Sequence, residues 1–131
     1  MEEVRAPTAE AALRRILTTA VRERVSDVHI EPQESFIRVR FRRDGILYDR
    51  FTMMLAMKKP ISVRAKVVGS MDIAESRLPQ DGSYSETVDG VSYDFRISTL
   101  PSLYGETIVI RILSGKVPMR WSVGRLSSAS S

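Results

Sequence analysis

Cysteine is absent from this 131-residue chain, and histidine occurs only once. A disulfide framework is therefore excluded, and a zinc site built from cysteine and histidine lacks its ligands. No apolar run approaches the ~20 residues that span a bilayer. The start, Met1-Glu2-Glu3-Val4-Arg5, lacks the basic and then apolar order of a signal peptide. The sequence therefore predicts a soluble, cytoplasmic protein with no metal site.

Length and charge set further bounds. A chain of this size corresponds to one domain, which buries roughly two thirds of its unfolded surface and so forms an ordinary core. The formal charge of +4 comes from 20 basic and 16 acidic residues. This mild bias permits a nucleic-acid or anionic-lipid partner without indicating one.

The apolar pattern predicts the secondary structure. Apolar residues recur every three or four positions from Leu13 to Val25, which predicts an amphipathic helix over roughly residues 7–24. From Asp27 the period changes to two, as is typical of strands with one buried face. Pro60 begins a second predicted helix, with Gly69 near its end.

Asp44-Gly45 and Asp89-Gly90 predict two tight hairpin turns. The resulting order is a helix, three strands, a helix and three strands. Hairpin links favour an α+β domain whose mainly antiparallel sheet of about six strands carries helices on one face. We expect this domain over residues 7–114, between a flank at 1–6 and a flexible tail at 115–131 that ends in serines and alanine.

A phosphate-binding loop of the pattern G-x-x-x-x-G-K-[ST] would indicate a nucleotide hydrolase. Val117 follows Gly115-Lys116, and Ile110 stands where the first glycine is required. The sequence therefore predicts no ATPase motor in this chain, no catalytic residue and no cofactor of its own.

Asp27, His29 and Glu31 share the polar face of one predicted strand. A histidine beside carboxylates is conceivable as an acid–base catalyst. Alternating charges on a strand more often form a solvated or interfacial face, so an independent hydrolase is the least favoured hypothesis.

Arg38, Arg40 and Arg42 alternate with apolar residues and form the clearest basic cluster. Guanidinium groups bind phosphates through paired hydrogen bonds, so this face can hold a nucleotide or a nucleic-acid backbone. The alternative is a solvated face on which these arginines pair with acidic residues. The candidate acidic partners are Asp27, Glu31 and Asp49.

Arg96 and Arg111 also alternate with apolar residues, so we expect both on the polar face of the sheet. Arg77 precedes a dense turn signal, Leu78-Pro79-Gln80-Asp81-Gly82. We expect Pro79 to end the preceding segment and Gly82 to permit a turn that directs Arg77 and Asp81 outward. The pattern alone leaves open whether the arginines meet solvent or a ligand.

Five blocks of sequence occur in a recognisable order. They are SDVHIEP (26–32), RVRFRRDG (38–45), DIAESRLPQDG (72–82), DFRISTLP (94–101), and GE (105–106) with RIL (111–113). Over roughly residues 7–113 they resemble the second N-terminal domain of type II secretion and type IV pilus assembly ATPases, of the general secretory pathway protein E type.

This resemblance implies a PAS-like α+β domain that precedes a RecA-like motor domain with the Walker motifs. The parent assembly would be a homo-hexameric ATPase that uses ATP and Mg²⁺ on the cytoplasmic side of the bacterial inner membrane. The implied partner is the motor domain of the same or a neighbouring subunit, with membrane platform proteins contacted indirectly. Nucleic acid is not an expected partner.

The resemblance also implies that arginines of this domain face the nucleotide held by the motor. The matching positions are Arg77, Arg96 and Arg111, with Arg64 and Lys66 as weaker additions. Ser76 and Ser83 stand where the family often has basic residues. Two function hypotheses remain: a non-catalytic domain of a secretion or pilus ATPase, and a free-standing module that binds nucleic acid or acidic lipid through Arg38, Arg40 and Arg42.

Overall fold

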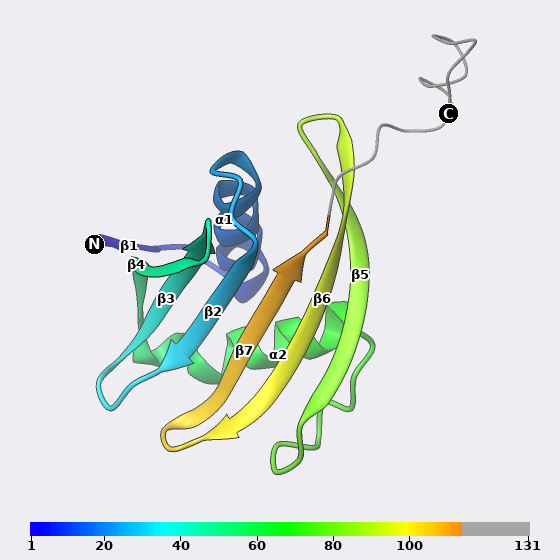
Figure 1. The fold of residues 1–131 in the computed structure, drawn as a ribbon. Helices are drawn as coiled ribbons and strands as arrows, with labels where there is room; N and C mark the ends of the chain where they lie inside the picture. The colour runs from blue at the N-terminus through cyan, green and yellow to red at the C-terminus, as the bar shows by residue number, and fades with distance from the viewer. Residues whose placement is uncertain (114–131) are drawn as a thin grey trace, which may run out of the picture.

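The computed structural model describes residues 1–113. This part of the chain forms one seven-stranded sheet with two α-helices (Figure 1). The elements are β1 Glu2–Glu3, α1 Ala9–Arg22, β2 Asp27–Pro32, β3 Phe36–Arg43, β4 Ile46–Met54, a 3-10 turn Leu55–Met57, α2 Lys58–Val68, β5 Gln80–Val88, β6 Val91–Ser102 and β7 Gly105–Ile112.

The strand order is β1-β4-β3-β2-β7-β6-β5. Every pair is antiparallel except β1 with β4, which is parallel. The predicted α+β class with a mainly antiparallel sheet is therefore confirmed. The additional strand, β1, lies in the predicted flank and has only two residues, too few to show a hydrophobic period. The predicted tail, 115–131, lies outside the described residues.

The first helix begins one residue after its cap. Thr8 has an extended φ of −140°, and its hydroxyl accepts a hydrogen bond from the Ala11 amide at 3.1 Å. Such a cap satisfies one of the amides that a helix start leaves unpaired. The helix buries one apolar stripe against the sheet: Ala12, Leu13, Ile16, Leu17, Ala20 and Val21.

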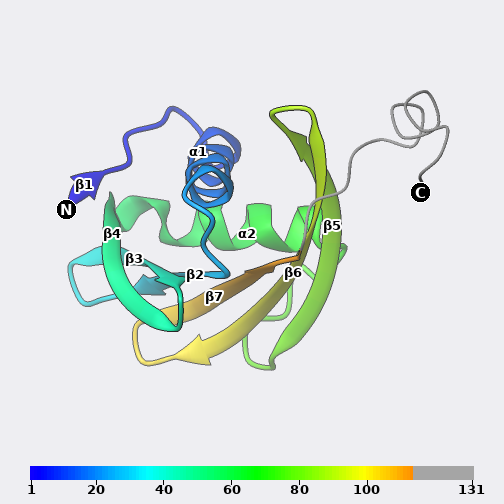
Figure 2. The same ribbon diagram turned by 45° about the horizontal axis from the view of Figure 1, so that its top comes forward.

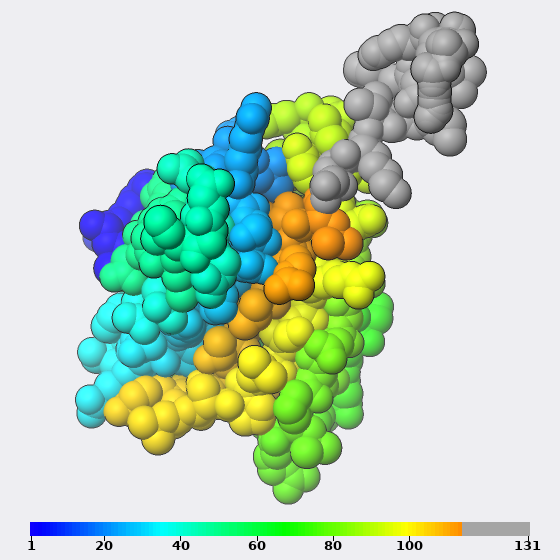
Figure 3. All heavy atoms as spheres, viewed as in Figure 1, coloured from blue at the N-terminus to red at the C-terminus, as the bar shows by residue number. Residues whose placement is uncertain are grey.

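Both helices cover the same face of the sheet, which curves around them (Figure 2). The buried apolar residues of β2 to β7 point into this layer, and the largest buried side chains are Phe41, Phe51 and Phe95. We call the other side the open face. Figure 3 looks onto it, with β7 in orange between β2 in blue and β6 in yellow. Alternation along the strands therefore places most polar residues of β2, β3, β5, β6 and β7 on one uncovered surface.

Gly82 has a different role from the predicted one. It lies inside β5, paired with Ile97, and its φ is not positive. A Cβ built on Gly82 would lie 2.2 Å from the carbonyl oxygen of Gly69, just after α2. The turn interpretation is therefore wrong. Gly82 permits close packing of the end of α2 against β5.

Candidate anion-binding site on the open face

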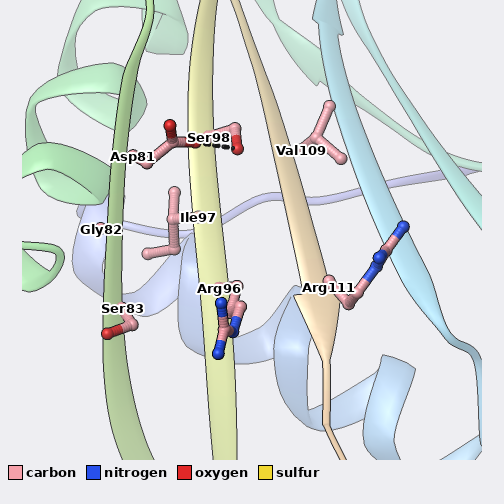
Figure 4. A pocket seen from close by; sticks show the side chains of 8 residues that line it. All are labelled: Asp81, Gly82, Ser83, Arg96, Ile97, Ser98, Val109 and Arg111. Atoms are coloured by element: carbon pink, nitrogen blue, oxygen red, sulfur yellow. Dashed lines mark hydrogen bonds between the residues drawn. The ribbon is translucent and has the colours of Figure 1, made fainter.

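Arg96 on β6 and Arg111 on β7 are direct cross-strand partners. Phe95, Ile97 and Ile110 beside them are buried in the core, so both arginines lie on the open face, as the alternation predicts. They border a hollow of about 640 Å³ (Figure 4). Its lining consists of Asp81, Gly82, Ser83, Arg96, Ile97, Ser98, Val109 and Arg111.

The two guanidinium groups differ in their contacts. Nε of Arg111 donates to Oδ1 of Asp27 at 3.1 Å, while the side chain stays 69% exposed. Within residues 1–113, its two terminal nitrogens make no hydrogen bond, and Arg96 has neither a hydrogen bond nor a carboxylate partner. Both side chains therefore have donors free for an anion in the hollow.

Polar side chains complete the hollow on the β5 side. Ser83 is the cross-strand partner of Arg96. Ser98 donates to Oδ1 of Asp81 at 2.6 Å, a contact drawn in Figure 4. Ser98 was not among the predicted site residues. Counting back along the hairpin from Asp89-Gly90 gives the register that pairs it with Asp81.

Asp27 stands at the centre of the open face. Its cross-strand partners are Arg111 on β7 and Arg42 on β3. Its second oxygen, Oδ2, lies 3.5 Å from Nε of Arg42 and accepts from the Ser26 hydroxyl at 3.2 Å. The carboxylate is only 9% exposed. Asp27 thus links the predicted basic cluster to the hollow.

Glu31 neutralises the rest of that cluster. It accepts hydrogen bonds from Arg40 at 3.0 and 2.7 Å and from Arg38 at 3.3 Å. Burial alone raises the pKa of Glu31, but the Arg40 hydrogen bonds and the charges of Arg40 and Arg38 outweigh it, so the pKa lies below its usual value. These arginines therefore pair with Asp27 and Glu31, as the alternative of a solvated face expects. Asp49 pairs with Arg40 in strand register.

His29 is largely covered and lies 3.6 Å from Glu31 through Nδ1. Burial, together with the charges of Arg40 and Arg42, lowers its pKa, and Glu31 and Asp27 offset this only in part. The imidazole is therefore neutral at pH 7 and lies within an ion-pair network. Among residues 1–113, no group of three or more histidine, aspartate or glutamate side chains is arranged to hold a metal ion.

The other predicted arginines lie apart from the hollow. Arg64 is on α2, on the helix-covered side, 3.6 Å from Glu10. Arg77 lies between α2 and β5 with a side chain 90% exposed, 3.9 Å from Glu75. The structure thus brings Arg96 and Arg111 together and leaves Arg64 and Arg77 outside the lining.

Comparison with known proteins identifies the family of this chain. The model of the family described as "Type II/IV secretion system protein" matches residues 2–129. This chain belongs to that family. It is 43% identical over 99 residues to the type IV pilus assembly ATPase PilB of Myxococcus xanthus, a match that covers 75% of this chain and 18% of that protein.

Two further relatives agree. Type II secretion system protein E of Klebsiella pneumoniae is 44% identical over 98 residues, which cover 75% of this chain and 20% of the relative. The protein transport protein HofB homolog of Escherichia coli K12 is 42% identical over 113 residues, which cover 86% of this chain and 24% of the relative. The chain spans about a fifth of the length of these relatives, and corresponds to their N-terminal region.

The described part of the chain also contains a buried ion pair. Nζ of Lys66 on α2 lies 2.8 Å from Oε1 of Glu106 on β7, with side chains 3% and 9% exposed. Ser62 donates to the same oxygen at 2.8 Å, and Lys66 also donates to the carbonyl of Glu75. The Lys66 ammonium is thus held inside the domain. The pairing of Lys66 with Glu106 was not predictable from the sequence pattern, since the two residues are distant in the chain.

Neither helix within residues 1–113 has the length and apolar content needed to cross a bilayer.

Proposed function

We propose that this chain is a non-catalytic domain of a secretion or pilus-assembly ATPase. Its role is to present Arg96 and Arg111 to the phosphates of ATP bound by a motor domain. The observation that carries this proposal is their cross-strand pairing beside an uncovered hollow of about 640 Å³. The family of the chain and the ATPase names of its relatives support the choice of nucleotide.

The chemistry favours a phosphate ligand. A guanidinium offers donors in a fixed planar arrangement that matches two phosphate oxygens. Arg96 and Arg111 lie on regular strands, so the backbone fixes where both side chains originate. An arginine that reaches a γ-phosphate across an interface stabilises the charge that develops during transfer, an effect worth about 10³- to 10⁵-fold in rate.

The assembly follows from the same proposal. The motor domain, in the same or a neighbouring subunit of a homo-hexamer, would cover the open face and supply ATP and Mg²⁺. Arg77 lies on the loop between α2 and β5 with a side chain 90% exposed, and would meet a second part of that motor. Arg64 lies on the helix-covered side and would need a different contact. The assembly would act on the cytoplasmic side of the inner membrane with its secretion or pilus platform.

A chimera tests the proposal. In it, this chain replaces the matching segment of the Klebsiella type II secretion system protein E, and ATP turnover is measured with saturating Mg²⁺ and ATP. We expect Arg96→Ala to reduce kcat by at least about tenfold, since an arginine in this role is worth more than that. Circular dichroism checks that the variant remains folded.

Arg5→Ala is the matched control. Arg5 is 82% exposed, and within residues 1–113 its side chain forms an ion pair only with Glu3, two residues away. The same loss of charge there should leave turnover unchanged. If Arg96→Ala and Arg5→Ala give the same turnover as the unmodified chimera, the nucleotide role is wrong.

The second hypothesis, a module that binds nucleic acid or lipid through Arg38, Arg40 and Arg42, has less support. Each of these arginines has a carboxylate partner on the same face. A phosphate backbone would have to displace Glu31 and Asp27 before it gained those contacts.

A further inference from the structure

Asp27 binds Arg111, the arginine that a ligand in the hollow would also need. The Asp27 carboxylate binds Arg111 through Nε, the nitrogen nearest the backbone. Figure 4 shows the result: the Arg111 side chain extends from β7 toward β2, away from Arg96, which stays near β6. The two guanidinium groups therefore start from adjacent positions and point apart.

The Asp27 contact can be broken without leaving a buried charge unpaired. When Arg111 leaves, Oδ2 of Asp27 keeps Nε of Arg42 at 3.5 Å and the Ser26 hydroxyl at 3.2 Å. An unpaired carboxylate with 9% exposure would be costly. Because Asp27 has these reserve partners, Arg111 is free to exchange between Asp27 and a ligand.

We propose that Asp27 sets the affinity and selectivity of the hollow by competing with the ligand for Arg111. Within residues 1–113 the terminal nitrogens of Arg111 are unbonded, but the side chain turns back toward Arg96 only if a ligand attracts it more strongly than the single carboxylate of Asp27 does. The site would therefore take linked phosphates with several charges, such as the end of a nucleoside triphosphate, and bind singly charged anions poorly. This inference rests on the proposed phosphate role of Arg96 and Arg111.

The test uses the ¹⁵N-labelled chain and inorganic tripolyphosphate, followed by nuclear magnetic resonance of the arginine Nε–H groups. In the free chain, the Arg111 Nε–H should exchange slowly with water because it is bonded to Asp27. Saturation with tripolyphosphate should shift both arginine signals and speed exchange at Arg111. Chloride at the same ionic strength should change neither.

Asp27→Asn keeps the shape of the side chain and removes its charge. We expect it to bind tripolyphosphate at least about fivefold more tightly, which is the lower end of the usual range for coupling between two sites. Asp81→Asn is the matched control. Asp81 lines the same hollow and bonds to Ser98, but has no arginine partner within residues 1–113. Its gain in affinity should be clearly smaller.

The double variant Asp27→Asn, Arg111→Gln separates competition from a general effect of charge. In the absence of Arg111, Asp27→Asn should raise the affinity for tripolyphosphate by no more than Asp81→Asn does. If Asp27→Asn and Asp81→Asn raise the affinity for tripolyphosphate equally while Arg111 is present, Asp27 does not compete for Arg111. The proposed phosphate site would remain. If tripolyphosphate shifts neither arginine in any variant, the proposed phosphate role fails and the competition with it.

If Asp27→Asn prevents folding, the unmodified chain still tests whether a ligand takes Arg111 from Asp27. Persistence of slow Arg111 Nε–H exchange at saturating tripolyphosphate would show that the ligand binds without taking Arg111 from Asp27. That result would overturn the inference.

Discussion

The carbonyl oxygen of Gly69 lies 2.2 Å from the point where a Cβ on Gly82 would stand. Gly69 ends α2, and Gly82 lies in β5 at the border of the hollow. The helix layer and the sheet therefore meet at this contact, with the backbone of one element against the backbone of the other. Neither side can move aside as a flexible side chain would.

Substitution of Gly82 should consequently destabilise the fold. We expect Gly82→Ala to lower the free energy of unfolding by about 1–3 kcal/mol, the usual cost of overpacking, and Gly82→Val to lower it further. Urea unfolding followed by circular dichroism measures both. Ser83→Ala, on the neighbouring exposed position, should stay close to the unmodified chain. An unchanged thermal midpoint in Gly82→Val would contradict the close approach.

Much of the fold was predictable because its signals are local. The period of two predicted the strands, the two Asp-Gly pairs predicted the β3–β4 and β5–β6 hairpins, and the spacing from Leu13 predicted α1. The central pairing of β2 with β7 was not predictable. It joins residues that lie 78 to 84 positions apart, and the same alternation would fit several strand orders.

The buried pair of Lys66 and Glu106 leads to a second prediction. Lys66→Met would leave a carboxylate that is 9% exposed with only the Ser62 hydroxyl, and its Oε2 already lacks a partner within residues 1–113. We expect a loss of about 3–5 kcal/mol in the free energy of unfolding, as for other broken buried pairs. Urea titration at pH 7 provides the measurement.

Two further variants define this result. Lys66→Met combined with Glu106→Leu should recover part of the loss, because no unpaired charge remains inside. Asp89→Asn breaks the exposed pair with Arg22 and should leave the unfolding midpoint near that of the unmodified chain. A Lys66→Met variant as stable as Asp89→Asn would show that the buried pair contributes little.

His29 should titrate below the usual range. Its pKa in the folded state is lowered from 6.5 by burial first, with Arg40 and Arg42 adding to the effect. As pH falls below 6.5, the unfolded chain binds the proton before the folded chain does. Stability from the neutral imidazole is therefore complete above pH 6.5 and declines as pH falls toward the folded pKa.

Since His29 is the only histidine, its ring signals in a nuclear magnetic resonance titration are unambiguous. We expect a midpoint below pH 6.5, and a smaller loss of stability between pH 7 and pH 5 in His29→Asn than in the unmodified chain. A midpoint at or above 6.5 would mean that Glu31 and Asp27 outweigh the burial.

The site itself was only partly predictable. Alternation placed Arg96 and Arg111 on one face, and the candidate acidic partners of the basic cluster included Asp27 and Glu31, which the structure pairs with it. The bond between Asp27 and Arg111 spans 84 positions and depends on the order of strands, so no local pattern contained it. The role of Gly82 was missed for the same reason.

Glu31 offers the sharpest test of the basic cluster. In the unmodified chain Glu31 holds Arg38 and Arg40, so we expect weak binding of labelled single-stranded DNA with little dependence on salt. Glu31→Gln removes the charge that holds both arginines. Binding should then tighten, and the slope of log K against log salt should steepen by about 0.7 for each arginine freed. Fluorescence anisotropy at several salt concentrations measures both quantities.

Glu34→Gln is the control, because Glu34 is exposed in the turn between β2 and β3 and has no arginine partner within residues 1–113. It changes the net charge equally and should leave the slope unchanged. Tight, steeply salt-dependent binding of single-stranded DNA by the unmodified chain would contradict this prediction. It would mean that a phosphate backbone displaces Glu31 without help, and the nucleic-acid module would become the better hypothesis for this face.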